Sequence, residues 1–195
     1  MIHTAWSGAP RGGRAARDSV GPGTGDAGSA RTKLTTPYSL GSLTPQDPAD
    51  TNVRRMTPYS TGDQEIPLEN NDWKTLGGGI DSNVYDLARF GDRLAAGGVL
   101  TRTSLTTMWT KPDTLSAYAY GWDTGIHTDA KSRDHRVVAK GGSQSGVLSH
   151  LRVYPDAGIT IAVLMNDRSQ ESGKPLQNPT TLTRDIGALM LNALP

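Results

Sequence analysis

Apolar residues recur at helical spacing between the triple glycine Gly77–Gly79 and the pair Gly97–Gly98. Ser82 is predicted to cap this helix, and Asp86 follows in the first turn, where the helix dipole favours a carboxylate. The glycine pair is predicted to end the helix, because glycine readily adopts the left-handed backbone that closes a last turn. The apolar positions of the helix are Val84, Leu87, Phe90 and Leu94.

A second, shorter helix is predicted to follow, with Thr101 as its cap and Pro112 beyond its end. Leu105, Met108 and Trp109 share the apolar side of this segment. The pattern therefore predicts two consecutive helices ahead of the strands.

Beyond these helices the apolar pattern changes to a period of two, which is typical of β-strands. The first predicted strand carries Tyr118, Tyr120 and Trp122 on one side. The second is a short apolar strand from Arg136 to Lys140, and the third covers residues 147–154. One face of the third strand has Val147, Ser149, Leu151 and Val153, and the other has Leu148, His150, Arg152 and Tyr154.

The sheet is predicted to close with a hairpin and one further strand. Residues 155–158 read Pro-Asp-Ala-Gly, which is the chemistry of a tight turn. The apolar run 159–165 that follows is nearly continuous, which predicts a central strand covered on both faces.

A C-terminal helix is predicted from Asn178, as its cap, and Pro179, at its first position. Its expected packing stripe consists of Leu182, Ile186, Leu189 and Met190. Helices, then an antiparallel meander, then a terminal helix indicate an α+β fold, in which an antiparallel sheet is packed by the C-terminal helix.

The chain is predicted to consist of two parts of unequal length. Residues 1–42 are of low complexity, rich in Gly, Ala, Arg and Pro, and are expected to be disordered. Residues 43–195 are expected to form the folded domain, and their first part, 43–72, reads as a turn-rich loop with at most one short strand.

Composition removes several classes of function. The 20 basic and 19 acidic residues give a formal net charge of +1, which argues against a nucleic-acid partner held by bulk charge. The chain has no cysteine, so disulfides, cysteine-ligated metals and cysteine nucleophiles are excluded. It has no apolar stretch long enough for a membrane span and no secretory signal, and no compartment follows from the sequence.

The segment with the most chemical content is Lys140-Gly141-Gly142-Ser143, at the end of a predicted strand. Backbone without side chains lets a substrate come close enough to pair with the strand and leaves an N–H group to face an oxyanion. The lysine offers a positive charge to a substrate carboxylate or to a proton network. A glycine-rich turn after a strand is the ordinary structural alternative.

Five segments in order resemble the C-terminal half of the serine β-lactamase-related family, which includes class C β-lactamases, D-alanyl-D-alanine carboxypeptidases and family VIII esterases. Lys140-Gly141-Gly142 resembles its third motif, Lys-Thr-Gly or His-x-Gly. The other matching segments are Leu76–Ser82 with Asp86–Phe90, Gly98–Thr101 with Leu105–Met108, Tyr120–Trp122, and Val153–Ile159 with Val163–Asn166.

This resemblance implies a partial β-lactamase or transpeptidase-like fold, comparable with penicillin-binding proteins, and hydrolysis of a β-lactam, peptide or ester through a serine acyl-enzyme. It implies that Lys140 orients substrate and proton transfers, that Gly142 is the fixed glycine, and that the Ser143 N–H is one oxyanion donor. Gly141 replaces a residue that often carries a hydroxyl. Neither a metal nor another cofactor is expected, and members of this family are commonly exported.

Two motifs of the family are absent from the sequence. No serine has a lysine three residues later, so there is no Ser-x-x-Lys nucleophile, and no tyrosine begins a Tyr-x-Asn or Tyr-x-Ser motif. Tyr38-Ser39-Leu40 and Tyr59-Ser60-Thr61 come nearest to the second. We therefore expect a truncated chain, with the nucleophile-bearing half replaced by the N-terminal forty residues.

Several alternatives remain open from the residues alone. Ser143 or Ser145 with His150 or His135 and an aspartate could form a triad, although the spacing does not fit the nucleophile elbow. Histidines 127, 135 and 150 lack metal-ligand spacing. The rings of Tyr118, Tyr120, Trp122 and Trp109 could stack on a ligand, although packing in the core and on the sheet is favoured. The whole chain could be a non-catalytic interaction module, a remnant of the fold that self-associates through apolar surface, or one half of a site completed by another chain.

Overall fold

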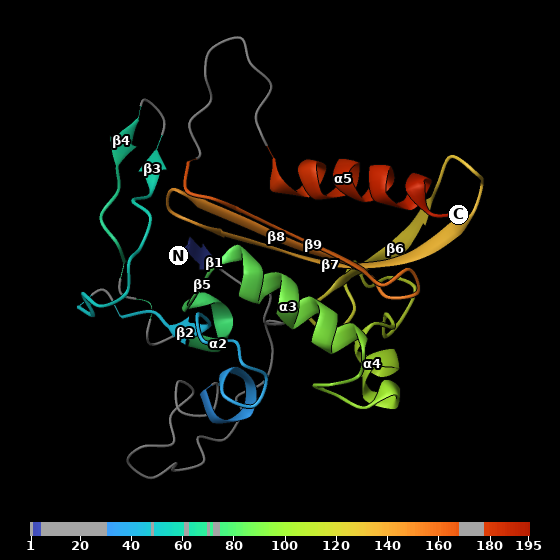
Figure 1. Ribbon diagram of the computed structural model, residues 1–195, viewed down its shortest axis with the longest axis horizontal. Helices are drawn as coiled ribbons and strands as arrows, with labels where there is room; N and C mark the ends of the chain where they lie inside the picture. Colours follow the sequence, from blue (N-terminus) through green and yellow to red (C-terminus); the bar gives the residue numbers. More distant parts are fainter. Residues whose placement is uncertain are drawn as a thin grey trace.

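A computed structural model describes residues 2–4, 31–47, 49–60, 63–69, 71, 75–167 and 178–195. The main body is a four-stranded antiparallel sheet with helices on both faces (Figure 1). Its strands are β6(Asp123–Thr128), β7(Asp134–Gln144), β8(Val147–Tyr154) and β9(Ile159–Met165), in that spatial order. The α+β class and the antiparallel sheet with its C-terminal helix are confirmed.

The smaller elements gather at one end of this sheet. β1(Ile2–Thr4), β5(Ile80–Ser82) and β2(Thr44–Pro45) form a three-stranded sheet in the order β1-β5-β2, and β3(Tyr59–Ser60) pairs with β4(Gln64–Glu65). A π-helical turn, η1(Arg31–Thr35), and the short α2(Thr75–Gly78) complete the group. The turn-rich segment 43–72 therefore contributes three two-residue strands, where one short strand was expected.

The predicted disordered segment 1–42 lies mostly outside the described residues. Its described parts are 2–4, which form β1, and 31–42, in which Thr35, Leu40 and Ser42 are buried. The division of the chain at residue 42 stays a prediction.

Helix α3(Val84–Ala95) begins one residue later than predicted. Its cap is Asn83, whose Oδ1 accepts the Asp86 N–H at 2.9 Å, whereas Ser82 is fully buried as the last residue of β5. Asp86 lies in the first turn as expected, and its carboxylate also accepts the Ser42 N–H at 2.8 Å. The carboxylate therefore ties residue 42 to the start of α3.

The second predicted helix is α4(Arg102–Met108), and its cap is Thr101 as expected, since Thr101 Oγ1 accepts the Ser104 N–H. The strand predicted through Tyr118 and Trp122 is wrong: this segment turns, with Gly121 at a φ of +82°, and β6 begins only at Asp123. The left-handed backbone at Gly121 breaks the extended pairing that the alternation of rings had suggested.

β7 is longer than predicted. It runs through Lys140-Gly141-Gly142 and ends at Gln144, because every residue from Val138 to Gln144 has a partner on β8. β9 has helices on both faces, as expected, but it lies at the edge of the four-stranded sheet and is not central. The two predicted faces of β8 are confirmed by the packing of its side chains.

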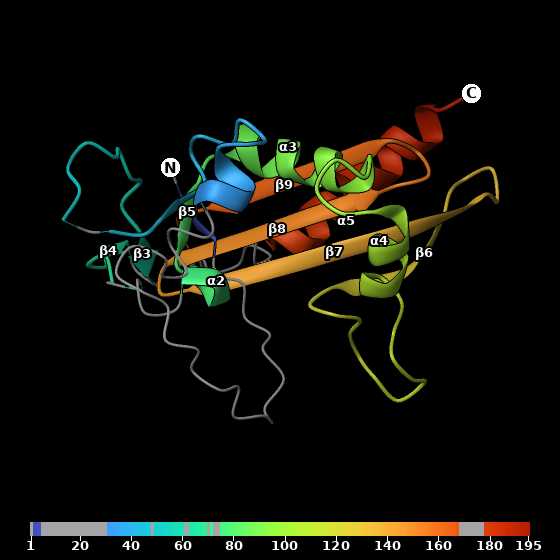
Figure 2. The ribbon, with the colours of Figure 1, turned by 90° about the horizontal axis from the view of Figure 1, so that it is seen from below.

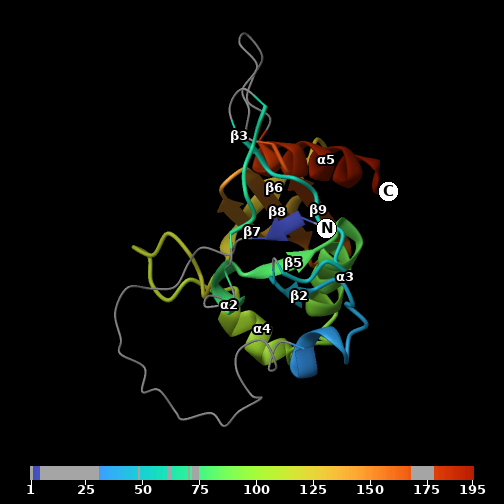
Figure 3. The same ribbon diagram turned by 90° about the vertical axis from the view of Figure 1, so that its left-hand side faces the viewer.

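The two faces of the sheet bury different side chains. On one face, α3 and α4 pack with β7 and β8 through the residues Leu87, Leu94, Leu105, Trp109, Trp122, Val138, Leu151 and Val153. On the other face, α5(Pro179–Ala193) covers Val137, Tyr154, Ile159 and Ile161 with Leu191. Figures 2 and 3 show this three-layer order, with α5 on one side of the strands and α3 and α4 on the other.

The face of α5 that contacts the sheet differs from the predicted one. The cap Asn178 and the first residue Pro179 are confirmed, but Ile186, Leu189 and Met190 are 40%, 73% and 43% exposed. The buried positions are Pro179, Thr183, Gly187 and Leu191. The helix thus places its small and hydroxyl-bearing side on the sheet and leaves the apolar stripe outside.

Two contacts explain this orientation. Gly187 lies directly over Tyr154, and a Cβ atom at this position would be 2.4 Å from Tyr154 Oη. Thr183 Oγ1 lies 2.7 Å from Nδ1 of His150, a ring that is only 3% exposed. A leucine in either place would collide with Tyr154 or leave the buried imidazole without a polar partner.

Gly187→Ala is expected to destabilise the chain by about 1–2 kcal/mol, because overpacking against Tyr154 outweighs the gain in helix propensity. The matched control is Gly125→Ala on β6, where the nearest atom to the new Cβ is 3.8 Å away. Urea unfolding of both variants checks the prediction. Equal or greater stability for Gly187→Ala would contradict the close approach of helix and sheet.

Burial lowers the pKa of His150 to about 4, with a smaller contribution from the positive charge of Arg152. Between pH 6.5 and 4 the unfolded chain therefore binds a proton that the folded chain does not, so stability falls as the pH drops through this range. The full loss is on the order of 3 kcal/mol.

His150→Asn keeps a polar atom for Thr183 and removes the titration. Its free energy of unfolding is expected to depend less on pH than that of the unmodified chain between pH 6.5 and 4. Urea titrations at several pH values measure the difference, and parallel curves for the two proteins would show that His150 is not the group responsible.

Candidate functional site

The segment singled out by the sequence lies on a stretch of β7 that extends beyond β6. The β6–β7 pairing ends at Asp123 opposite Ala139, while the β7–β8 pairing continues to Gln144. From Lys140 onwards, the side of β7 that faces away from β8 thus lies past the end of β6. Extended backbone of this kind can pair with an added strand or a peptide-like ligand.

The four residues of the segment differ in exposure. Ser143 is exposed, Gly141 is half-buried, and Gly142 and Lys140 are buried, with Lys140 only 7% exposed. Because side chains alternate along β7, Lys140 lies on the same face as Val138, which is the face covered by α3 and α4.

The ammonium group of Lys140 lies under an aromatic ring. Its Nζ is 5.7 Å from the centre of the Tyr118 ring, within the range of a cation–π interaction. Asp123 is close by: burial raises the pKa of its carboxyl group, and the positive charges of Lys140 and Lys111 partly offset this rise. The Lys140 charge therefore lies against an aromatic ring and influences the Asp123 carboxyl group, and the sequence predicted neither interaction.

Three amide side chains fix the far end of β7. Asn71 Nδ2 donates to Gln144 Oε1 at 2.9 Å and to Gln46 Oε1 at 3.0 Å, and Gln144 Nε2 donates to the Gly78 carbonyl. Gln46 and Asn71 are almost fully buried. The network thus connects Gln144, the last residue of β7, to segments that lie more than sixty residues earlier in the sequence.

The triple glycine contributes to this network. A Cβ atom on Gly79 would lie 2.2 Å from the carbonyl oxygen of Asn71, and Gly78 has a φ of +136°. The glycines thus allow residue 71 to approach α2 closely. Polar residues scattered through a turn-rich segment give no periodic signal, which is why the sequence did not indicate this contact.

The alternative serine triads gain no support from the hydrogen bonds of the described residues. Ser145 Oγ donates to Glu69 Oε1 at 2.9 Å. The His150 ring contacts Thr183, and the His135 ring contacts Asp129.

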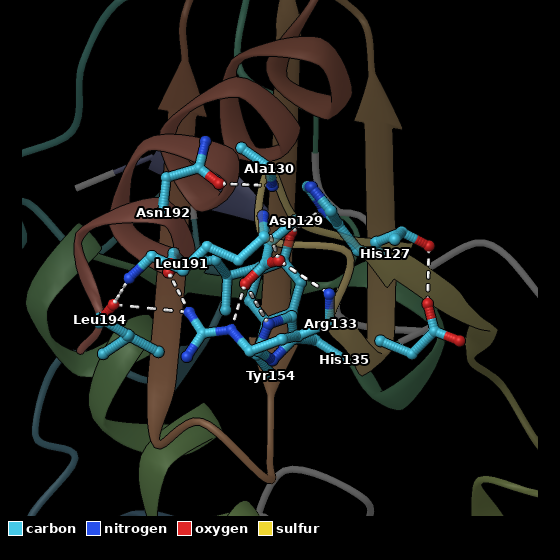
Figure 4. Close-up of polar contacts among 12 residues, drawn as sticks. His127, Asp129, Ala130, Arg133, His135, Tyr154, Leu191, Asn192 and Leu194 are labelled. Atoms are coloured by element: carbon cyan, nitrogen blue, oxygen red, sulfur yellow. Dashed lines mark hydrogen bonds and ion pairs between the residues drawn. The ribbon is translucent and has the colours of Figure 1, made fainter.

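A carboxyl group with several hydrogen-bond donors, that of Asp129, lies in the turn between β6 and β7 (Figure 4). It accepts hydrogen bonds from the backbone N–H groups of Lys131 and Arg133, from the Arg133 side chain and from His135. Burial favours a higher pKa for this carboxyl group, but these bonds, led by that to His135, outweigh burial and hold the pKa well below its usual range.

This cluster has a structural role. Arg133 also donates to the carbonyls of Leu191, Leu194 and Pro195, and Ala130 N–H donates to Asn192 Oδ1 at 2.8 Å (Figure 4). These bonds satisfy carbonyl groups at the end of α5 and fix the helix to the turn. The described residues contain no group of three or more side chains suited to a metal ion. No described helix is long and apolar enough to cross a membrane.

Solved structures with the same fold are found at low sequence identity. A beta-lactamase/D-alanine carboxypeptidase from Pseudomonas syringae has a TM-score of 0.64 at 16% identity, with 87% of this chain and 54% of that chain covered. A D-stereospecific amidohydrolase from Streptomyces sp. has a TM-score of 0.60 at 18% identity, over 86% and 49% of the two chains.

An octameric penicillin-binding protein homologue from Pyrococcus abyssi has a TM-score of 0.61 at 18% identity, with 85% of this chain and 37% of that chain covered. The chain thus spans between about a third and about half of the length of these structures. No protein of curated function matches the chain.

The sequence profile of the beta-lactamase family matches residues 22–182, which is most of the chain and includes α3, α4, the whole four-stranded sheet and the start of α5. The solved structures named above share this fold. The chain belongs to the beta-lactamase family.

Proposed function

We propose that this chain forms the third-motif side of an acyl-transfer cleft. The observation that carries the proposal is the Lys140-Gly141-Gly142 stretch of β7, which lies beyond the end of β6 in a member of a serine hydrolase family. The substrate class is a β-lactam, an ester or a peptide-like amide, and water is the final acyl acceptor.

Each residue of the motif has a distinct role in this proposal. Lys140 supplies a positive charge that orients substrate and proton transfers, and its position under Tyr118 restrains the ammonium group. Gly141 and Gly142 let the substrate backbone approach β7. The backbone N–H of Ser143 is one of two oxyanion donors, and loss of such a donor typically costs about 3–4 kcal/mol of transition-state stabilisation.

The attacking serine is proposed to come from outside these 195 residues. The sequence holds neither a Ser-x-x-Lys nor a Tyr-x-Asn motif, and related structures are about two to three times as long as the part that the chain matches. An upstream segment of the same polypeptide or a second chain that carries both motifs would complete the site.

The test is turnover of a chromogenic β-lactam and of short p-nitrophenyl esters. The chain alone is expected to give none, and addition of a chain that carries the two missing motifs is expected to produce turnover. Lys140→Ala should abolish this activity, whereas the exposed Lys33→Ala should leave it intact. Turnover that survives Lys140→Ala would refute the role of Lys140.

The oxyanion role of residue 143 is tested in the same complemented enzyme. Ser143→Gly keeps the N–H group and is expected to retain activity. Ser143→Pro removes that donor and is expected to lower turnover by about 10²–10³-fold. Circular dichroism verifies that both variants keep the sheet, and equal activity of the two would contradict the assignment.

A second candidate is a non-catalytic module that associates through its surface. It is favoured by the exposed apolar stripe of α5, where Ile186, Leu189 and Met190 lie outward. Size-exclusion chromatography at several concentrations separates the cases. A dimer that Leu189→Lys converts to a monomer would support association through α5, and a monomer at all concentrations would exclude it.

A further inference from the structure

Two large aromatic rings remain exposed beside the third motif. Tyr118 is 54% exposed and Tyr120 is 59% exposed, and the neighbouring Leu115 is 95% exposed. Burial of an aromatic side chain is among the larger gains available to a fold, so rings left in solvent on one short segment mark a candidate contact surface.

The segment that carries these rings is held firmly. Ala119 N–H donates to the Trp122 carbonyl at 2.9 Å, and Tyr120 N–H donates to the Met108 carbonyl at 3.2 Å. Trp122 is 3% exposed and packs edge-to-face on Trp109, with the ring centres 6.3 Å apart. The backbone is therefore anchored to α4 and to the core, so ordering the two rings on a ligand costs little conformational entropy.

A hollow adjoins the second ring. An open cavity of about 330 Å³ is lined by Thr103, Ser104, Thr107, Met108 and Tyr120. Its walls combine the Met108 thioether and a tyrosine ring with the hydroxyl groups of α4. This volume suits an apolar group of the size of a benzyl or branched alkyl side chain.

The rings are also connected to the proposed reaction site. The Tyr118 ring lies over the Lys140 ammonium group, and Tyr120 follows two residues later, so at most about 7 Å of backbone separates the two tyrosines. The cavity is therefore lined by the same short segment that carries the ring over Lys140.

We propose that Tyr118, Tyr120 and the cavity on α4 form the subsite that binds an aromatic or branched apolar group of the acyl substrate. The inference rests on the proposed function for the position of the reacting carbonyl group on β7. The subsite predicts that substrates with a bulky apolar group near the scissile bond are preferred over substrates with a methyl group there.

The experiment uses two carboxylate ligands that differ by one ring. N-acetyl-D-phenylalanine and N-acetyl-D-alanine are titrated into the ¹⁵N-labelled chain, and dissociation constants are obtained from amide chemical shifts. The phenylalanine derivative is expected to bind about 5–10-fold more tightly, in line with the value of one aromatic contact. Tyr120→Ala, and the Tyr118→Ala/Tyr120→Ala double variant, should remove this preference.

Three further variants make the result specific. Tyr120→Phe keeps the ring and should keep the preference. Tyr85→Ala removes a tyrosine that is 79% exposed on α3 and should also keep it. Lys140→Gln tests the proposed function, and it should weaken both ligands equally without changing their ratio.

Equal binding of the two ligands by the unmodified chain, or a preference that persists in the double tyrosine variant, would overturn the subsite. A preference that depends on the tyrosines while Lys140→Gln leaves both affinities unchanged would support the subsite and contradict the role proposed for Lys140.

Discussion

The pairing of β7 with β8 is the constraint on which the rest of the structure depends. It is continuous from Val138 opposite Val153 to Gln144 opposite Val147, so each residue of β7 has a fixed face. Val138 and Lys140 point to α3 and α4, and Val137 points to α5. A shift of one residue would exchange the two cores and place the Lys140 side chain beneath α5.

The same pairing connects the candidate site to the rest of the molecule. Beyond Lys140, Gly141 and Gly142 have no side chains that would obstruct the approach of a ligand to β7. The end of the strand is held by hydrogen bonds that connect Gln144 to Asn71 and Asn71 to Gln46. The lysine is restrained by Tyr118, whose segment is anchored by two tryptophans. This stretch of β7 is thus supported by hydrogen bonds between amide side chains at one end and by aromatic packing at the other.

Local signals in the sequence were sufficient for the caps, turns and strand faces. Thr101, Asn178 and the Pro-Asp-Ala-Gly turn were predicted correctly, because each depends on hydrogen bonds between residues a few positions apart. The stripe of Leu182, Ile186, Leu189 and Met190 was assigned to the wrong side of its helix. Apolar periodicity indicates which residues of a helix can be buried. In α5, the buried face was decided by the fit of Gly187 over Tyr154 and by the contact of Thr183 with His150.

The sequence by itself determined the family and the antiparallel sheet with its terminal helix, since these reside in residue order and local chemistry. Only the tertiary structure decided that Tyr118 covers that lysine, that Asn71 binds Gln144, and that Arg133 and Asp129 secure the end of α5. These contacts join residues that lie on different elements. No period or short-range pattern encodes them, because they arise from the way whole elements pack.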